Sequence, residues 1–290
     1  MAEIALVTDS TAYLPPEAVT QYNVHVIPLY VHMAGQTYRD GFDLNLENFY
    51  QYLETAAELP TTSQPSMGDF LELYRELSKK ADAIISIHIS AGISGTIASA
   101  MAARQALQAE MDNPPEVYVI DSRITSASQA LIVMAAGRAI AEGRPAAEIA
   151  VMAESMAERS HAIFVVDTLK YLHKGGRIGG AATLMGTALK IKPLLYFREG
   201  KIDALEKVRT SKRARTRMLE IVEEWAGGKP IRFGVVHAQA EEEAHQIRDY
   251  ILTRLECQEH LISHLSPVIA THVGPGTLGV VFYTVEDGDS

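Results

Sequence analysis

Cysteine and long apolar runs are scarce in this sequence of 290 residues. Cys257 is the single cysteine, so no disulfide bond can form within the chain, and a reducing compartment is expected. No stretch approaches the roughly 18 consecutive apolar residues that indicate a membrane-spanning helix. The first residues, MAEIALVTDST, lack the basic and apolar regions of a signal peptide. These absences predict a cytoplasmic protein without stable membrane insertion, and they leave transient membrane contact open.

Positive charge is also in short supply. The chain has 26 Lys and Arg residues against 36 Asp and Glu residues, which gives a net charge of -10. Because nucleic-acid binding needs a basic face that neutralises phosphates, no nucleic-acid partner is expected. One basic stretch, KVRTSKRARTR at 207–217, departs from this balance. It is either a solvated helix face or a docking patch for an acidic partner or a phosphorylated ligand.

Motifs for catalysis and metal binding are incomplete. GISGT is not a nucleophile elbow, because Thr96 stands where G-x-S-x-G needs its last glycine. Thr11, two residues after Asp9, stands where an aspartyl phosphotransferase has its second aspartate, and KGGRIGG is neither a dinucleotide fingerprint nor a Walker A loop. His260 and His264 fall in an expected strand without further ligands, so no metal and no cofactor are expected. A hydrolase or phosphotransferase that uses Ser94 or Asp9 remains an alternative.

Apolar runs alternate with stretches of helical periodicity, which is typical of an α/β protein. The expected strands lie at 4–10, 24–33, 83–90, 116–122, 161–168, 201–210, 231–238, 260–265 and 277–285. The expected helices lie at 46–59, 66–80, 95–111, 126–143, 146–160, 213–226 and 241–256. Ser66 and Asp69 can cap the second of these helices, and Pro28 predicts an irregularity in the second strand. The pattern predicts a Rossmann-like parallel-sheet domain at 1–159, a smaller α+β domain at 160–290, and a ligand cleft between them.

Hydroxyl groups gather where the strands of the first domain end, and ligands of open parallel sheets bind at such ends. The polar residues in question are Thr8, Asp9, Ser10, Thr11, Thr61, Thr62, Ser63, Ser90, Ser94, Asp121 and Ser122. Ser66 and Ser94 stand at helix starts, where backbone N–H groups favour an anion. Each residue also has a local structural role open to it: Ser94 as a helix cap, and Asp9 as an acceptor for neighbouring N–H groups. A set of neutral donors suits one carboxylate better than a triphosphate.

The glycine-rich part of the second domain adds two basic side chains, Arg177 in HKGGRIGG and His272 in THVGPGTLG. Its glycines either allow the backbone to approach a ligand or a neighbouring segment closely, or they are needed only for the geometry of turns. The apolar residues of the same region are Leu184, Met185, Leu189, Ile191, Leu194 and Leu195. They are either ordinary core or one wall of the cleft. In the second case the ligand has an anionic head and a long apolar tail, as a fatty acid does, and each buried methylene contributes roughly 0.8 kcal/mol.

Six stretches in this order resemble the DegV family, bacterial fatty-acid-binding proteins of the FakB type. The stretches are VTDSTAYLP near the start, TTSQPS at 61–66, SAGISGTIASA at 90–100, DTLKYLHKGGRIGG at 167–180, IKPLL at 191–195 and GPGTLG at 274–279. The resemblance covers nearly the whole chain. Two departures are local: Ala91 replaces one of two common serines, and DSRITSASQAL replaces a helix start that commonly contains glycine.

The resemblance implies a two-domain α/β fold, the DegV or EDD fold, with a long-chain fatty acid between the domains. It implies that Thr62 and Ser94 hold the carboxylate, that His272 lies near it, and that Arg177 serves presentation to a fatty-acid kinase for acyl-phosphate formation and phospholipid synthesis. Ser63 is included with the ligand-binding hydroxyls. The expected supporting residues are Asp9, Ser10, Gly95, Thr96, Gly274 and Gly276. The protein would then be a carrier rather than an enzyme; a lipid-sensing regulatory module is a further alternative.

Overall fold

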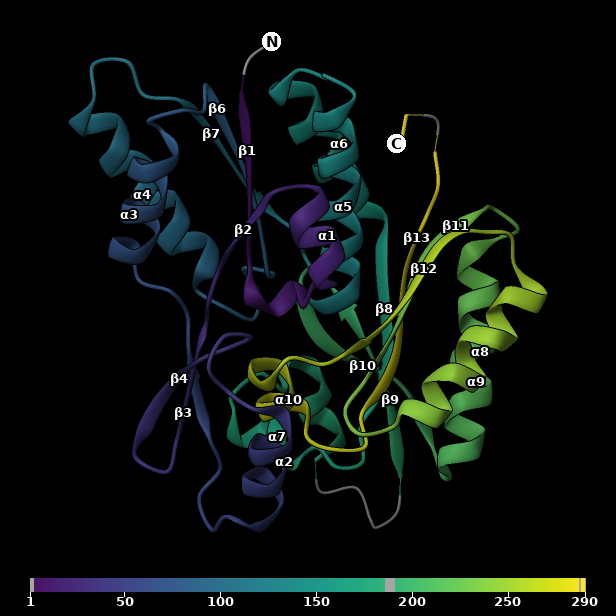
Figure 1. Cartoon of the computed structure of the whole chain (residues 1–290). Coiled ribbons are helices and arrows are strands. Elements are labelled where there is room, and N and C mark those ends of the chain that lie inside the picture. Colours follow the sequence, from purple (N-terminus) through teal and green to yellow (C-terminus); the bar gives the residue numbers. More distant parts are fainter. Residues whose placement is uncertain (1–2, 186–190, 287, 290) are drawn as a thin grey trace.

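The computed structural model describes residues 3–185, 191–286 and 288–289. Two sheets and their helices alternate in layers across the molecule (Figure 1). The helices α3 and α4 form one outer layer, α5 and α6 lie between the two sheets, and α8 and α9 form the other outer layer. The predicted α/β class is therefore confirmed.

The first sheet contains four parallel strands in the order β2-β1-β6-β7. Its strands are β1 (Ile4–Asp9), β2 (Val24–Ile27), β6 (Ala83–His88) and β7 (Glu116–Asp121). Every residue of β6 is buried, because helices cover both faces of the sheet. The near-continuous apolar run of this strand follows from that burial, and the predicted parallel sheet of the first half is confirmed.

The helices beside this sheet follow the predicted boundaries closely. They are α3 (Met67–Leu77), α4 (Thr96–Glu110), α5 (Ser126–Ala141) and α6 (Ala146–Arg159). In α3, Phe70 and Tyr74 are buried on one face, and Ser66 and Asp69 form the predicted capping box. The central helix α5 is buried nearly all round because it packs against both sheets.

The second sheet has six strands in the order β10-β9-β8-β13-β11-β12. Its strands are β8 (Ser160–Val165), β9 (Lys192–Arg198), β10 (Lys201–Val208), β11 (Ile231–His237), β12 (Cys257–His264) and β13 (Leu278–Thr284). All neighbours are antiparallel except β11 and β12. The helices α8 (Ser211–Ala226) and α9 (Glu241–Arg254) cover its outer face. The division proposed at 159/160 falls between α6 and β8 and remains a prediction.

A small antiparallel sheet corrects two expectations. It has the order β4-β3-β5 and consists of β3 (Tyr30–Met33), β4 (Gln36–Arg39) and β5 (Thr61–Ser63). The run at 24–33 is not one strand. It divides at Pro28 into β2 and β3, which belong to different sheets, because proline has no N–H for a sheet ladder. The segment TTSQPS was expected as a loop at the edge of the parallel sheet, but its first half is strand β5.

The remaining elements are short. They are α1 (Pro16–Gln21), α2 (Leu46–Thr55), α7 (Lys170–Lys174), α10 (Pro267–Val273) and the 3-10 turns η1 (Ser10–Ala12) and η2 (Gly179–Leu184). Helix α10 packs against α2, α7, β3 and β5, so the small sheet and these helices close one end of the space beside the second sheet (Figure 1). None of the helices in the described part of the chain is long and apolar enough to cross a membrane.

Candidate functional site

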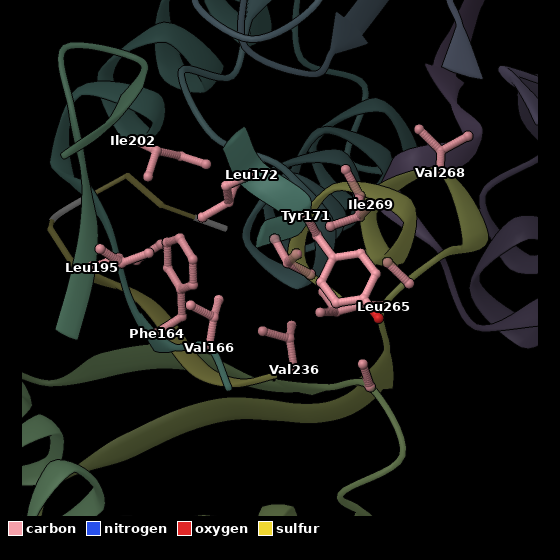
Figure 2. Close-up of a cluster of buried hydrophobic side chains, with 14 of the residues drawn as sticks. Phe164, Val166, Tyr171, Leu172, Leu195, Ile202, Val236, Leu265, Val268 and Ile269 are labelled. Carbon is pink, nitrogen blue, oxygen red and sulfur yellow. The ribbon is translucent and has the colours of Figure 1, made fainter. Parts of the chain in front are cut away.

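An apolar cavity lies beside the inner face of the second sheet. It encloses about 850 Å³ free of protein atoms, part of it open to solvent. Apolar residues that line it include Ala162, Phe164, Val236, Leu265, Ile269 and Val281. Figure 2 shows Phe164 and Val236 rising from the sheet toward the space that Ile269 faces from α10. Side chains of the second sheet and of α10 thus enclose a space that suits an apolar molecule.

Polar side chains from four segments meet at one place on this wall. Thr62, Ser94, Arg177 and His272 all line the cavity. Thr62 Oγ1 lies 2.7 Å from Nε2 of His272, and the Arg177 guanidinium donates from Nε to the carbonyl of Ile93, next to Ser94. These contacts join β5, α10, the loop after α7 and the loop before α4. The four residues expected at the head-group site are therefore brought together.

The surroundings of His272 determine the charge of its ring and which ring nitrogen carries the proton. Burial first, and then the positive charge of Arg177, lower the pKa of His272 to about 4, so the ring is neutral near pH 7. Its Nδ1 is buried and has no hydrogen-bond partner among the described residues. An unpaired buried N–H costs more than an unpaired lone pair, so the proton belongs on Nε2, which donates to Thr62 Oγ1. The hydroxyl proton of Thr62 is then free for a ligand oxygen.

Ser94 stands at the start of α4, but it is not the helix cap. The N-cap residue is Gly95, and Ser94 Oγ accepts from the backbone N–H of Thr96 at 3.3 Å and lies 2.9 Å from the Thr96 hydroxyl. Gly95 has no side chain to cap α4, and apart from the Thr96 N–H, which donates to Ser94, the first-turn N–H groups have no partner within the helix. A positive dipole end and a hydroxyl thus meet beside the cavity, as a carboxylate requires.

Arg177 brings a positive charge to the same place. Its Nε donates to the carbonyl of Ile93 at 3.1 Å, and its Nη1 donates to the carbonyl of Gly175 at 2.8 Å. Within residues 3–185, 191–286 and 288–289, no acceptor bonds to its Nη2. The guanidinium is therefore held in place by two backbone carbonyls with donor capacity left over.

Two neighbours modify the expected donor set. Ser63 borders the cavity, but its hydroxyl lies 2.9 Å from Nε2 of His32, on the adjacent strand. Because successive side chains of a strand point to opposite faces, Thr62 and Ser63 cannot both direct their hydroxyls to one ligand. Gln64 also lines the cavity and was not foreseen. A Cβ on Gly95 would lie 2.8 Å from Gln64 Nε2, so glycine at 95 lets this amide approach α4.

The sequence and the fold were compared with known proteins. Residues 3–285 match the family described as "Uncharacterised protein, DegV family". The chain belongs to the DegV family. It is 42% identical to Protein DegV of Bacillus subtilis over 279 residues, which span 96% of this chain and 98% of that protein.

Solved DegV structures share the fold. A fatty-acid-binding DegV family protein from Thermus thermophilus matches with a TM-score of 0.92 and 36% identity, covering 98% of this chain and 100% of that one. DegV from Bacillus subtilis, a fatty acid binding protein, matches with a TM-score of 0.86 and 40% identity over the same shares. The predicted fold and family are both confirmed.

In this DegV chain, Asp9 and Ser10 accept hydrogen bonds from the backbone of residues that line the cavity. Asp9 is fully buried and accepts hydrogen bonds from the backbone N–H groups of Thr11 and Ile89. Burial alone would raise the pKa of Asp9, but these bonds and that of His88 outweigh it and lower the pKa. Ser10 donates to Asp40 and accepts from the backbone of Leu29, a cavity residue. Asp9 and Ser10 border a separate pocket rather than this cavity. The Asp9 carboxylate is fully buried and occupied by internal hydrogen bonds, which argues against Asp9 as a phosphotransferase nucleophile.

A serine, a histidine and an aspartate do form a hydrogen-bonded row, but away from the cavity. Ser86 Oγ lies 2.6 Å from Nε2 of His88, and Nδ1 of His88 lies 3.1 Å from Asp9 Oδ2. All three are fully buried and none lines the cavity, while the hydroxyl of Tyr74 lies 2.8 Å from Ser86. Ser94, which does line the cavity, has Thr96 rather than a histidine as its neighbour. A molecule in the cavity therefore does not reach the Ser86–His88–Asp9 row. Ser94, which it can reach, has no histidine beside it to act as a base.

The glycines of GPGTLG hold the loop after α10 against α7. Gly274 has φ +81°, and a Cβ there would lie 2.3 Å from the ring of Tyr171. Gly276 has φ +73°, and a Cβ there would lie 2.5 Å from Asp167. Both positions need glycine for conformation and for space. They position the end of α10, which carries His272, and do not contact the cavity themselves.

The apolar residues expected as one wall of the cleft are mostly core. Leu184, Leu194 and Leu195 are buried, Ile191 is half-buried and Met185 is 42% exposed. None of these lines the cavity, and Leu189 lies outside the described residues. The wall comes instead from β8, β11, β13 and α10. Strand geometry places Ala162 and Phe164 on one face of β8, but HAIFVV is apolar after His161, so no alternation in the sequence singles out that face.

Other basic and histidine features have structural roles. Arg217 of the basic stretch pairs with Glu206, Glu220 and Glu224, and Arg215 pairs with Glu243. The remaining cations of the stretch, Lys207, Arg209, Lys212 and Arg213, are exposed. His260 and His264 lie in strand β12 as expected, and the described residues contain no cluster of three His, Cys, Asp or Glu side chains able to hold a metal ion.

Proposed function

We propose that this DegV family protein binds a long-chain fatty acid, with the carboxylate at Thr62 and Ser94 and the acyl chain in the apolar cavity. One observation carries the proposal: the polar groups Thr62, Ser94, Arg177 and His272 gather at one place on a largely apolar cavity. The fatty-acid-binding DegV structures from Thermus thermophilus and Bacillus subtilis support it.

The donor set suits a carboxylate. Thr62 has a hydroxyl proton to donate because Nε2–H of His272 occupies its lone pair. The start of α4 adds backbone N–H groups, and Arg177 adds a positive charge with an Nη2 that no acceptor among the described residues occupies. His272 acts as a neutral donor to Thr62 rather than as a counter-ion, since its pKa is lowered to about 4. One cation and neutral donors together balance one carboxylate.

The acyl chain supplies most of the affinity. Each methylene that leaves water contributes roughly 0.8 kcal/mol, so a long chain outweighs the hydrogen bonds at its head. The hydroxyls fix which end of the ligand reaches the Arg177 loop. A carrier needs this orientation, because it keeps the reactive carboxylate at a defined place.

We further propose that the protein is a carrier and not an enzyme, and that it presents the carboxylate to a fatty-acid kinase. Ser94 has no histidine beside it, and Asp9 is buried away from the cavity. Phosphorylation of the ligand would then come from a partner that binds ATP. Arg177, at the head group, would steady the acyl phosphate as it forms.

Extraction of the purified, denatured protein with organic solvent, followed by mass spectrometry, tests the binding proposal. A long-chain fatty acid at about one equivalent is expected, with little in the Ser94→Ala variant after washing. If the protein stays empty after incubation with a panel of fatty acids, the proposal is wrong and the cluster serves a smaller anion.

A second assay tests presentation. The fatty-acid-loaded protein, a bacterial fatty-acid kinase and ATP with magnesium are expected to give acyl phosphate, detected as a hydroxamate. The Arg177→Gln variant, incubated with saturating fatty acid so that its occupancy matches that of the wild type, should give far less product. A loaded protein that no kinase accepts, while it binds another protein only when loaded, would favour the lipid-sensing alternative.

A further inference from the structure

A second polar group lines the cavity apart from the head-group site. Thr125 and Ser126 are 7% and 2% exposed, and both line the cavity. Neither Thr125 Oγ1 nor Ser126 Oγ has a hydrogen-bond partner within the described residues. A buried hydroxyl without a partner costs roughly 1–3 kcal/mol. Two such hydroxyls side by side indicate that something absent from the folded chain pairs with them.

The backbone at this place adds further donors. Thr125 is the N-cap residue of α5, a helix of 16 residues, and its side chain caps none of the first-turn N–H groups. Ser126 has φ 58°, a left-handed conformation that costs a non-glycine residue about 1 kcal/mol or more. The helix start is buried between the sheets and thus away from bulk water.

This group makes no hydrogen bond to the carboxylate site and lies against the wall of the acyl chain, although the carbonyl of Ile124 accepts from the N–H of Ser90 in the loop that leads to Ser94. Ala127, the next residue, packs on Gly234 of β11, where a Cβ would lie 2.4 Å from that of Ala127. The start of α5 therefore sits against the strand that supplies Val236 to the cavity wall. Neither hydroxyl bonds to Thr62, Ser94 or His272. A ligand that fills the cavity passes two separate polar points.

We propose that Thr125, Ser126 and the start of α5 form a subsite for an oxygen substituent on the acyl chain, so that the protein prefers a hydroxy fatty acid to its unsubstituted counterpart. The inference rests on the proposed function. An in-chain hydroxyl is both acceptor and donor, and it satisfies the buried hydroxyls that a methylene leaves unpaired. A site built to hydrogen-bond a substituent discriminates against the ligand that lacks it.

Competition binding tests this preference. A fluorescent fatty acid is displaced from the wild-type protein by stearate and by hydroxystearates with the hydroxyl at the second, third, tenth or twelfth carbon. One positional isomer is expected to bind roughly 5- to 100-fold tighter than stearate. Thr125→Val, which keeps the branched shape of threonine, should remove that preference: the hydroxystearate loses its partner, and stearate no longer leaves the threonine hydroxyl unpaired, so stearate should bind at least as tightly as to the wild type. Thr125→Ala is the second variant, and thermal unfolding checks that each is folded.

The Thr62→Val variant serves as the matched control, because it removes a hydroxyl of the carboxylate site and should weaken stearate and the hydroxystearates alike. Equal affinities for all isomers in the wild type would overturn the subsite while leaving fatty-acid binding intact. A preference that survives in both Thr125 variants would also overturn it. If stearate binding falls in Thr125→Val as much as in Thr62→Val, the start of α5 holds the carboxylate instead. If neither acid binds, both the subsite and the proposed function are wrong.

Discussion

Thr62 and His272 are 210 residues apart in the chain, yet Thr62 Oγ1 lies 2.7 Å from Nε2 of His272. The bond ties strand β5 of the small sheet to α10, whose far side packs on α7. Because the ring is neutral and its other nitrogen is buried without a partner in the described structure, the histidine is the donor. The bond therefore orients Thr62 to donate its own proton to the ligand.

We expect Thr62→Val to weaken fatty-acid binding roughly 5- to 100-fold, the effect of losing one buried donor to a charged group. The change keeps the shape of the side chain and removes the hydroxyl, and it also leaves Nε2–H of His272 unpaired. Isothermal titration with a long-chain fatty acid measures the loss.

Ser63→Ala is the matched control for this change, since Ser63 borders the same cavity but its hydroxyl bonds to His32. Its affinity should stay within about threefold of the wild type, well under the effect of one lost hydrogen bond. A loss at Ser63 as large as that at Thr62 would contradict the assignment of the donor.

Gly175 sets the position of the imidazole. A Cβ at this position would lie 2.2 Å from Nδ1 of His272, closer than atoms can approach. We expect Gly175→Ala to displace the ring, break its bond to Thr62 and lower fatty-acid affinity at least about tenfold. The occupancy of bound fatty acid, measured by native mass spectrometry, reports the change.

Gly176→Ala separates this contact from backbone strain. Gly176 has φ +70° and nothing within 4 Å of a Cβ, so alanine there costs about 1 kcal/mol of stability and touches no site residue. The variant should unfold at a lower temperature and still bind fatty acid normally. Equal binding losses in both variants would mean that the loop, and not His272, controls affinity.

The sequence alone predicts most elements of the fold because their signals are local. The buried run of β6 and the capping pair Ser66 and Asp69 at α3 each act within a few residues. Pro28 predicted only an irregularity, and not that the run at 24–33 divides between two sheets. The head-group residues, by contrast, came from the resemblance to the DegV family. That Thr62 meets His272 depends on how β5 pairs with β3 and how α10 packs, and neither pairing has a local signal.

The cavity wall shows the same limit. The glycine-rich segment drew attention because it is rich in leucine, yet Leu194 and Leu195 pack in the core. Phe164 and Val281 line the cavity because alternate residues of β8 and β13 face it. Alternation identifies a shared face, but only the tertiary fold decides whether that face meets a ligand or another side chain. For Thr125 and Ser126, the sequence does not show whether the hydroxyl caps the helix or stays without a hydrogen-bond partner.

The row formed by Tyr74, Ser86, His88 and Asp9 should act on stability and not on chemistry. We expect Ser86→Ala to lower the free energy of unfolding by about 1–3 kcal/mol, because it leaves the hydroxyl of Tyr74 and Nε2 of His88 buried without a partner. Urea unfolding measures this change. Fatty-acid binding should be preserved, since none of the four residues lines the cavity.

An ester-hydrolysis assay on the same variant addresses the enzymatic alternative. The wild-type protein and Ser86→Ala should both hydrolyse p-nitrophenyl esters no faster than buffer does. Hydrolysis by the wild type that disappears in Ser86→Ala would contradict a purely structural role and would require that the buried serine becomes accessible.

His272 also predicts how stability depends on pH. Burial and then the charge of Arg177 lower its pKa from 6.5 to about 4 in the folded protein. Between these values the unfolded chain binds a proton that the folded chain does not, so the free energy of unfolding falls as the pH is lowered. From neutral pH to about pH 4.5, this group should account for a loss of about 2–3 kcal/mol in the ligand-free protein.

The His272→Gln variant isolates this contribution, because an amide does not titrate here and can still donate to Thr62. Asp40 works in the opposite direction: burial raises its pKa to about 6, so its contribution to stability grows as the pH falls. That contribution is common to both proteins and cancels in their difference. Urea unfolding at neutral pH and at about pH 4.5 should therefore show a smaller decline in His272→Gln than in the wild type. Equal declines would mean that folding does not lower the pKa of His272, and this would contradict the desolvated, neutral ring that orients Thr62.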